Sequence, residues 1–193
     1  TQTVASTKAT TLNYGNSSKQ VNIHEGEFLH NKGFQGKGIK IAVLDAGFFK
    51  YQNIAAFDSL KINGQLKMTW DFVDNNASVN EDDAHGMHCL SILAGNLPGA
   101  FVGTAPAASY YLFRTEDVAS EFPVEEQNWL AAAEKADSIG IQMISSSLGY
   151  NTFDDASFNY TYADMNGKKT MITRGAAMAS NKGMIVMNSA GNS

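Results

Sequence analysis

Cysteine is nearly absent from this chain of 193 residues, in which Cys89 stands alone. A single cysteine excludes an internal disulfide, so cysteine usage does not identify the compartment in which the protein works. Long apolar runs are missing as well. Because a membrane-spanning helix needs about eighteen or more consecutive apolar residues, the sequence offers no candidate for one.

Basic side chains are too few to form a surface for nucleic acid. Lys and Arg number 14 against 19 Asp and Glu, which gives a formal net charge of −5. Nucleic acids are bound largely through basic side chains that neutralise phosphates, so we do not expect a nucleic-acid partner. With 44% hydrophobic and 17% charged residues, the composition is that of a compact domain with a sizeable core.

The C-terminal half repeats one order of elements. Residues 124–139 have the pattern of an amphipathic helix, and residues 141–145 follow as an apolar strand. A second helix then precedes the strand 184–188. Strands that are connected through a helix pair in parallel by a crossover, so the sequence predicts an α/β fold with a parallel sheet. Residues 1–20, rich in Thr, Ser and Asn, are predicted to be an extended arm before a domain at 21–193.

Asp45 follows the most apolar strand of the chain. Residues 37–44 form a near-continuous apolar and β-branched run, which is typical of a strand buried on both faces. Asp45 would then lie at the carboxyl end of this strand, the edge at which open α/β sheets collect ligands and catalytic groups. The alternative is that Asp45 only caps the next segment. Two further strands are predicted, at 67–73 and 108–113.

His85 is predicted to stand at the start of a helix. Apolar residues recur after it at helical spacing, at Met87, Leu90, Leu93 and Ala94. The imidazole would be presented to its surroundings, or would simply be a polar residue at a helix end. Cys89 lies on the same helical face and is expected to be a buried thiol beneath His85. A zinc site of His85, His88 and Cys89 is disfavoured, because positions 88 and 89 point to different faces.

Five short motifs occur in an order that resembles the subtilisin-like serine proteases, the subtilase family. They are Asp45-Ala46-Gly47, His85-Gly86-Met87-His88, Gly103-Thr104-Ala105-Pro106, Ser147-Leu148-Gly149 and Ala190-Gly191-Asn192. The resemblance implies a three-layer parallel sheet flanked by helices, incomplete in this chain, and a serine endopeptidase that cleaves proteins or peptides with an Asp-His-Ser triad. It also implies an extracellular or cell-envelope location and synthesis as a secreted, autoprocessed zymogen.

The resemblance gives each motif a role. Asp45 would orient His85, which would act as general base and acid. Asn192 would donate its side-chain amide to the oxyanion, unless it is an ordinary turn residue. Substrate would lie along Ser147-Leu148-Gly149 and Ala190-Gly191, unless these are only glycine-containing loops after strands. Two usual hydroxyl residues are replaced by Ala46 and Met87, and a usual glycine by Ala84, which would loosen the hydrogen bonding between Asp45 and His85.

No serine of this chain fits the role of nucleophile. Residues 145–147 end a predicted strand, and Ser193 follows Gly191-Asn192 with no helix behind it. In the family the nucleophilic serine opens a helix well downstream of the position of Asn192. We therefore expect the serine on a missing downstream segment, or on a separate chain of the same precursor that arises by cleavage after Ser193.

Three further assignments stay open at this stage. Calcium is a candidate cofactor, and no other is expected; the acidic residues that could hold it, or could form a solvated loop, are Asp71, Asp74, Glu81, Asp82 and Asp83. Glu121, Glu125 and Glu126 would favour basic substrate residues or form a solvated helix start, the second being preferred. His24 and His30 are expected at the surface.

The competing function is a catalytically silent, subtilase-like α/β binding module. A nucleotide site is disfavoured because no Gly-x-Gly-x-x-Gly follows the Asp45 strand.

Overall fold

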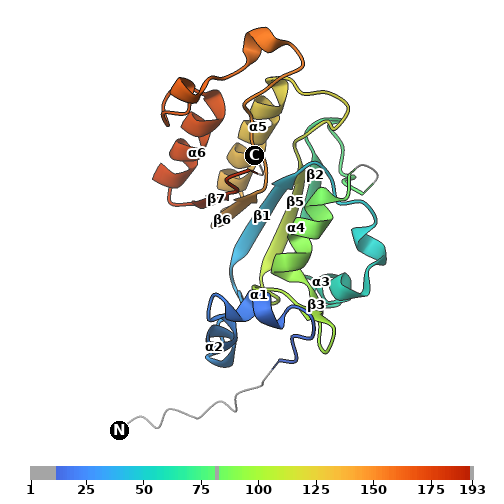
Figure 1. The fold of residues 1–193 in the computed structure, drawn as a ribbon. Coiled ribbons are helices and arrows are strands. Elements are labelled where there is room, and N and C mark those ends of the chain that lie inside the picture. Colours follow the sequence, from blue (N-terminus) through green and yellow to red (C-terminus); the bar gives the residue numbers. More distant parts are fainter. Residues whose placement is uncertain (1–11, 81–82, 192–193) are drawn as a thin grey trace.

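A five-stranded parallel sheet forms the centre of the protein (Figure 1). The computed structural model describes residues 12–80 and 83–191. The strand order is β2-β5-β1-β6-β7. The strands are β1 (Lys40–Asp45), β2 (Leu66–Asp71), β5 (Ser109–Arg114), β6 (Met143–Ser146) and β7 (Ile185–Asn188), and a short antiparallel hairpin joins β3 (Asn96–Leu97) and β4 (Phe101–Val102).

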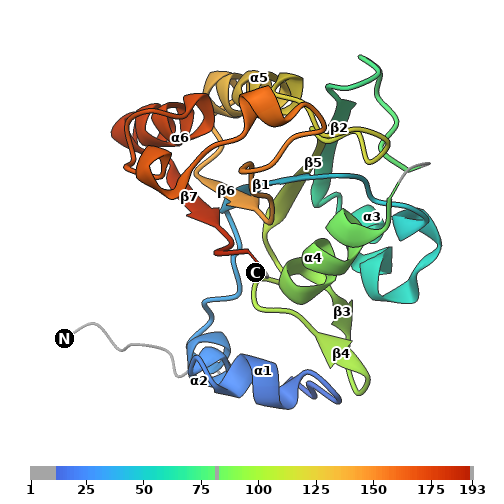
Figure 2. The same ribbon diagram turned by 45° about the horizontal axis from the view of Figure 1, so that its top comes forward.

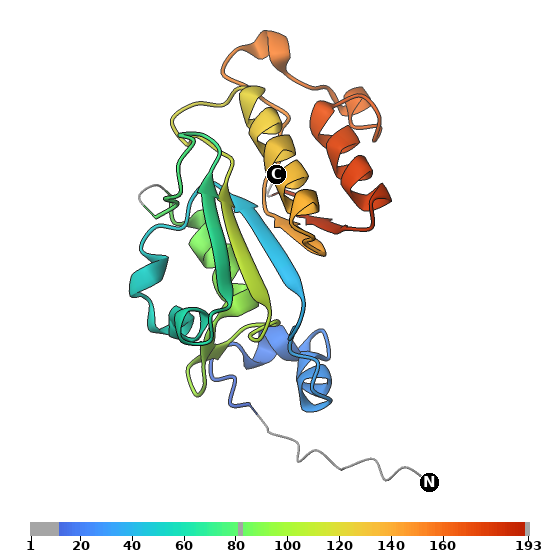
Figure 3. The same cartoon turned by 180° about the vertical axis from the view of Figure 1, so that it is seen from behind.

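Helices cover both faces of the sheet. In Figure 2, α5 (Val124–Ser138) and α6 (Met171–Asn181) lie together on one face, and α4 (His85–Ala94) lies on the other. The same three layers are seen from behind in Figure 3. The shorter helices are α1 (Ser18–Asn22), α2 (Gly26–Asn31), α3 (Asp58–Ile62), η1 (Tyr51–Asn53), η2 (Ala55–Phe57), η3 (Ala156–Phe158) and η4 (Tyr162–Asp164). Within the described part of the chain, every helix is too short or too polar to traverse a bilayer.

Strand β1 divides the core into two parts because its side chains alternate between the two faces. Ile41 and Val43 pack in the cluster beneath α4, whereas Ala42 and Leu44 pack in the cluster beneath α5 and α6. All four are at most 3% exposed. The residues of α5 predicted to face the sheet are buried in the second cluster: Trp129, Ala132, Ala133 and Ala136. The predicted α/β fold with a parallel, helix-flanked sheet is therefore confirmed.

The N-terminal segment differs from the prediction. Residues 1–11 of the expected arm lie outside the described residues, but Tyr14 is buried against Val21 and Val102 and α1 begins at Ser18. The Tyr14 hydroxyl is 2.8 Å from Nδ1 of His30, and Nε2 of the same ring is 2.9 Å from the carbonyl oxygen of Thr104. His30 is thus buried, and its expected surface position was wrong, because its partners lie 16 and 74 residues away.

Candidate active site

Asp45 ends β1 at the carboxyl edge of the sheet. It lies beside Arg114 of β5 in the strand register, and the Thr115 N–H donates to the Asp45 carbonyl at 3.0 Å. The Asp45 side chain is fully buried, and its Oδ1 accepts the N–H of Ala46 at 2.8 Å. Two strands and the following turn therefore hold the carboxylate in one position.

His85 is the first residue of α4 and contacts the buried carboxylate. Its Nδ1 is 2.7 Å from Oδ1 of Asp45, across 40 positions of sequence. The Asp83 carboxylate accepts the His85 backbone N–H at 2.6 Å and so satisfies one of the free donors at the helix start. The His85 side chain is 50% exposed. One edge of the ring is consequently fixed by Asp45 while the ring remains open to solvent.

Gly86 permits this contact. A Cβ at this position would lie 2.5 Å from the Gly47 carbonyl oxygen and 2.7 Å from Cβ of Asp45. Such distances are shorter than any ordinary contact, so a larger residue would push α4 away from the turn after β1. The glycine next to the histidine is therefore required by the close approach of helix and strand.

The electrostatics of Asp45 are set by opposing effects. Burial raises the pKa of its carboxyl group, because the charged form loses hydration, and the hydrogen bonds from His85 and Ala46 lower it. Oδ2 of the carboxylate is buried and accepts no hydrogen bond within the described part of the chain. The residue after Asp45 is Ala46, which has no hydroxyl to offer. A buried carboxylate on Nδ1 fixes the tautomer in which Nε2 is free to accept a proton.

Comparison with known proteins assigns the family. The sequence profile of the Subtilase family matches residues 36–193, most of the chain. The chain belongs to the subtilase family. It is 32% identical to thermitase of Thermoactinomyces vulgaris over 120 residues, which are 60% of this chain and 39% of thermitase. It is 33% identical to the minor extracellular protease Vpr of Bacillus subtilis over 127 residues, 61% of this chain and 14% of Vpr.

Solved structures agree on the fold of this subtilase. MycP1 with its N-terminal propeptide removed matches 92% of the chain with a TM-score of 0.63 at 22% identity. MycP1 from Mycobacterium smegmatis matches 98% of it with the same TM-score at 20% identity. The match covers 49% and 48% of those two chains, respectively. The subtilase described here therefore spans about half of MycP1 and two fifths or less of the two named relatives.

The two predicted substrate segments leave neighbouring strands. Ser147-Leu148-Gly149 follows β6 and Ala190-Gly191 follows β7. They are tied together because Nδ2 of Asn188 donates to the Leu148 carbonyl at 3.0 Å, and the Ser189 N–H donates to the Ser146 carbonyl at 3.0 Å. Their role as substrate-binding segments stays a prediction. Asn192 and Ser193 lie outside the described residues.

Cys89 lies beside the Asp45–His85 pair, as its helical spacing predicts. Its Sγ is 3.9 Å from Nδ1 of His85, and the thiol also interacts with the side chains of Ser147 and Asp45. Cys89 is partly exposed, so the expectation of a buried thiol was wrong. Burial still raises the pKa of the thiol, because the thiolate would be poorly hydrated.

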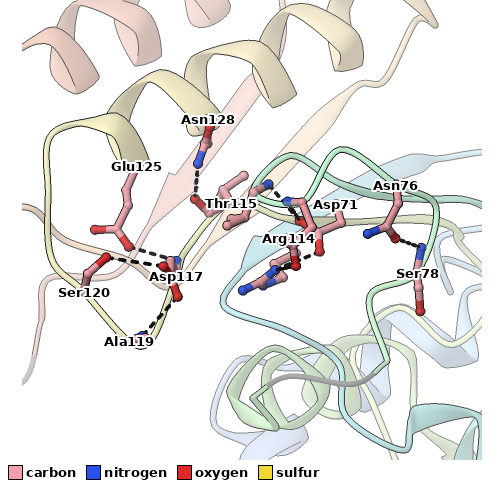
Figure 4. A network of polar contacts seen from close by, with 12 residues as sticks. Asp71, Asn76, Ser78, Arg114, Thr115, Asp117, Ala119, Ser120, Glu125 and Asn128 are labelled. Atoms are coloured by element: carbon pink, nitrogen blue, oxygen red, sulfur yellow. Dashed lines mark hydrogen bonds and ion pairs between the residues drawn. The ribbon is translucent and has the colours of Figure 1, made fainter.

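Two of the candidate calcium ligands, Asp71 and Asp74, bind other groups of the protein. Nη1 of Arg114 is 2.8 Å from Oδ2 of Asp71 and 3.0 Å from Oδ2 of Asp74 (Figure 4). Oδ1 of Asp71 accepts the backbone N–H groups of Val73 and Asp74. Glu81 and Asp82 lie outside the described residues. A guanidinium between two of the carboxylates repels a cation, so Asp71 and Asp74 do not fit calcium.

The acidic start of α5 is buried rather than solvated. Glu125 and Glu126 are 1% and 0% exposed, which contradicts the preferred interpretation of a solvated helix start. The carboxylate of Glu125 accepts the N–H groups of Asp117 and Phe122, at the two ends of the loop after β5. Figure 4 shows Glu125 reaching Asp117 across that loop. Glu126 accepts a hydrogen bond from the hydroxyl of Tyr160. These carboxyl groups therefore brace the structure, which their local sequence did not indicate.

Glu116 is expected to make stability depend on pH. It is buried and accepts hydrogen bonds from Tyr150 and Thr115, and burial raises its pKa from 4.5 to about 7. The folded state therefore favours the protonated form, so its contribution is fully present below about pH 4.5 and is lost as the pH rises through about 7. We expect Glu116→Gln to reduce the loss of unfolding free energy between about pH 5 and pH 8 by roughly 1–3 kcal/mol.

Urea unfolding at a series of pH values measures this effect. Glu134→Gln on the exposed face of α5 is the matched control, since it removes the same charge at the surface. A pH dependence of Glu116→Gln that equals that of the wild type would show that Glu116 is ionised in the folded protein.

Proposed function

We propose that the protein is a serine endopeptidase that cleaves proteins or peptides, with Asp45 and His85 as two members of an Asp-His-Ser triad. The observation that carries the proposal is the 2.7 Å contact between Oδ1 of the fully buried Asp45 and Nδ1 of the half-exposed His85. Membership of the subtilase family and relatives that are named proteases support the same activity.

In this mechanism His85 moves the proton. Nε2 takes the proton of a serine hydroxyl as the serine oxygen attacks the peptide carbonyl, and the imidazolium then protonates the leaving amine. In the second half of the reaction, His85 takes a proton from a water molecule, which attacks the acyl group on the serine. The ester bond to the serine then breaks, and His85 returns the proton to the serine oxygen. Asp45 holds the ring in the required tautomer and stabilises the imidazolium. Asn192 donates to the oxyanion, and Ser147-Leu148-Gly149 with Ala190-Gly191 holds the substrate backbone.

The nucleophilic serine is proposed to lie outside these residues, on a downstream segment or a separate chain of the same precursor. Two observations support this. Among the described residues, β7 is an edge strand, and Ile185 and Met187, which share one of its faces, are 54% and 56% exposed, as expected where a further part of the protein covers that face. The chain also covers only 49% of MycP1. By the same family likeness, the protein is proposed to be an autoprocessed zymogen that is secreted or held at the cell envelope. The name of the relative Vpr calls that protease extracellular.

Labelling with a fluorophosphonate probe tests the proposal on the full-length protein. We expect one labelled serine, identified by peptide mass spectrometry, and loss of labelling in His85→Ala. Intact mass then tells whether the labelled serine belongs to one continuous polypeptide with Asp45 and His85 or to a second chain. Folded protein that remains unlabelled would instead favour the catalytically silent binding module.

A further inference from the structure

We propose that a cavity at the amino edge of the sheet binds a small organic anion that carries two carboxylate or phosphate groups. The cavity has a volume of about 540 Å³, which is in the usual range of small-molecule sites. It lies where β1, β2 and β5 begin, whereas Asp45 ends β1. About the length of β1, roughly 16 Å, separates it from the Asp45–His85 pair. Binding there is therefore independent of the proposed peptidase activity.

The cavity is positively charged in a protein whose net charge is negative. The described residues that line it include Lys37 and Lys67 but no Asp or Glu, although the chain has 19 acidic and 14 basic residues. Within the described part of the chain, neither ammonium group has an acidic partner. Two ammonium groups at one cavity repel each other, and an anion between them offsets that repulsion. The charge of the lining therefore favours an anionic ligand.

Both lysines stand at irregular points of the backbone. The register of β2 with β5 shifts between Leu66 and Met68, so Lys67 is an extra residue of the strand. Such bulges re-aim a side chain and are frequent beside functional sites. Lys37 precedes Gly38 in a turn, and the φ of 87° at Gly38 is one that glycine adopts without strain. The local backbone thus sets the position of each lysine beside the cavity.

Hydrogen bonds hold the walls of the cavity together. Gln65 is 7% exposed, and its Nε2 donates to the carbonyl oxygens of Pro106 and Ala108 at 2.9 and 2.8 Å. The Ala107 N–H donates to the Gln35 carbonyl at 2.9 Å. These bonds join the segments that precede β1, β2 and β5. The cavity is consequently formed before a ligand arrives, which lowers the entropic cost of binding.

The rest of the lining suits a hydrophilic anion. Among the described residues no aromatic side chain lines the cavity, so it offers no ring on which a nucleotide base could stack. Side-chain groups that can donate hydrogen bonds to anionic oxygens come from Asn63, Asn96 and Ser109. Carboxylate and phosphate oxygens both form charge-assisted hydrogen bonds with ammonium groups. A ligand with two such groups can therefore contact both lysines and the amides between them.

Calorimetric titration of the full-length protein at low, matched ionic strength tests the site with succinate, its uncharged diamide succinamide, and pyrophosphate. We expect one succinate or one pyrophosphate per chain, with weaker binding as salt is added, and no binding of succinamide. The tighter of the two anions identifies whether carboxylate or phosphate is the preferred group. Lys37→Gln and Lys67→Gln should each lower the affinity roughly tenfold, the loss expected for one hydrogen bond to a charged group.

Lys168→Gln is the matched control, because it removes the same charge from an exposed loop outside the cavity. Its affinity should stay within about twofold of wild type, since a remote surface charge is screened. Absence of binding by both anions, equal binding of succinamide, or equal affinities in the Lys67 and Lys168 variants would overturn the site.

Acetylation of lysines gives a second readout that needs no variant. With the anion at ten times its Kd, acetylation of Lys37 and Lys67 by an N-hydroxysuccinimide ester should slow roughly tenfold, because only the unoccupied fraction reacts. Lys168 should react at the same rate with and without the anion. Peptide mass spectrometry measures each rate in the same sample. Anion binding that leaves the acetylation of Lys37 and Lys67 unchanged would show that the ligand lies elsewhere and would overturn the proposal.

Discussion

Replacing Asp45 by asparagine is expected to lower kcat by about four orders of magnitude, and His85→Ala by about six, values typical of serine proteases with this triad. Asparagine at position 45 would keep the shape of the side chain but would present its amide N–H to Nδ1 or leave the imidazolium without a negative charge. The double variant should be no slower than His85→Ala alone, because the two residues act as one unit. Steady-state hydrolysis of a peptide substrate by the full-length protein measures all three.

Asp83→Asn is the matched control for this experiment. Its carboxylate also lies next to His85, but it accepts the backbone N–H rather than the ring nitrogen. The asparagine oxygen can keep that hydrogen bond, so we expect a loss of less than about tenfold. If Asp45→Asn retained activity within tenfold of the wild type while remaining folded, Asp45 would not be the residue that orients the base.

Local patterns predicted that Asp45 and His85 lie at ends of regular elements, and the family resemblance predicted that they pair. The apolar run before Asp45 indicates a strand buried on both faces, and the periodicity after His85 indicates a helix that packs on the same sheet. A residue at the end of such a strand and one at the start of such a helix both lie at the carboxyl edge of the sheet. How close the two groups come depends on Gly86, whose missing side chain admits the Gly47 carbonyl and Asp45.

Residues whose partners are distant in sequence were not predictable in this way. His30 is buried by Tyr14 and the Thr104 carbonyl, and neither has a spacing that marks it as a partner. Glu125 and Glu126 have the charge pattern of a solvated helix start, yet the helix carries them into the protein, where backbone N–H groups and Tyr160 satisfy them. Polar burial depends on long-range partners, and a single sequence does not display these.

The replacement at position 46 is the departure from the family pattern with a visible consequence. Ala46 supplies its backbone N–H to Oδ1 of Asp45 but no hydroxyl, and Oδ2 has no hydrogen-bond partner within the described residues. The carboxylate is therefore held less completely than a hydroxyl neighbour would allow.

The largest loss of stability is expected when Asp71, the buried carboxylate that pairs with Arg114, is replaced by alanine. Asp71 and Arg114 are 1% and 4% exposed, and their side chains meet at 2.8 Å. In Asp71→Ala the guanidinium stays buried while its buried counter-charge is gone, and the N–H groups of Val73 and Asp74 lose their acceptor. We expect a loss of about 3–5 kcal/mol in the free energy of unfolding, measured by urea denaturation of the full-length protein.

Asp74→Ala removes the same charge from an exposed position, and so separates the effect of burial from the effect of charge. Asp74 contacts the same Nη1 atom of Arg114 at 3.0 Å, but its side chain is 64% exposed. Water screens that pair and replaces the lost carboxylate, so we expect a change of at most about 1 kcal/mol. Equal losses in the two variants would mean that burial does not strengthen the Asp71 contact. If Asp71→Ala loses much more unfolding free energy than Asp74→Ala, and the slope of this free energy with urea is unchanged, the stabilisation lies where β2 and β5 meet. These strands lie next to β1, which carries Asp45.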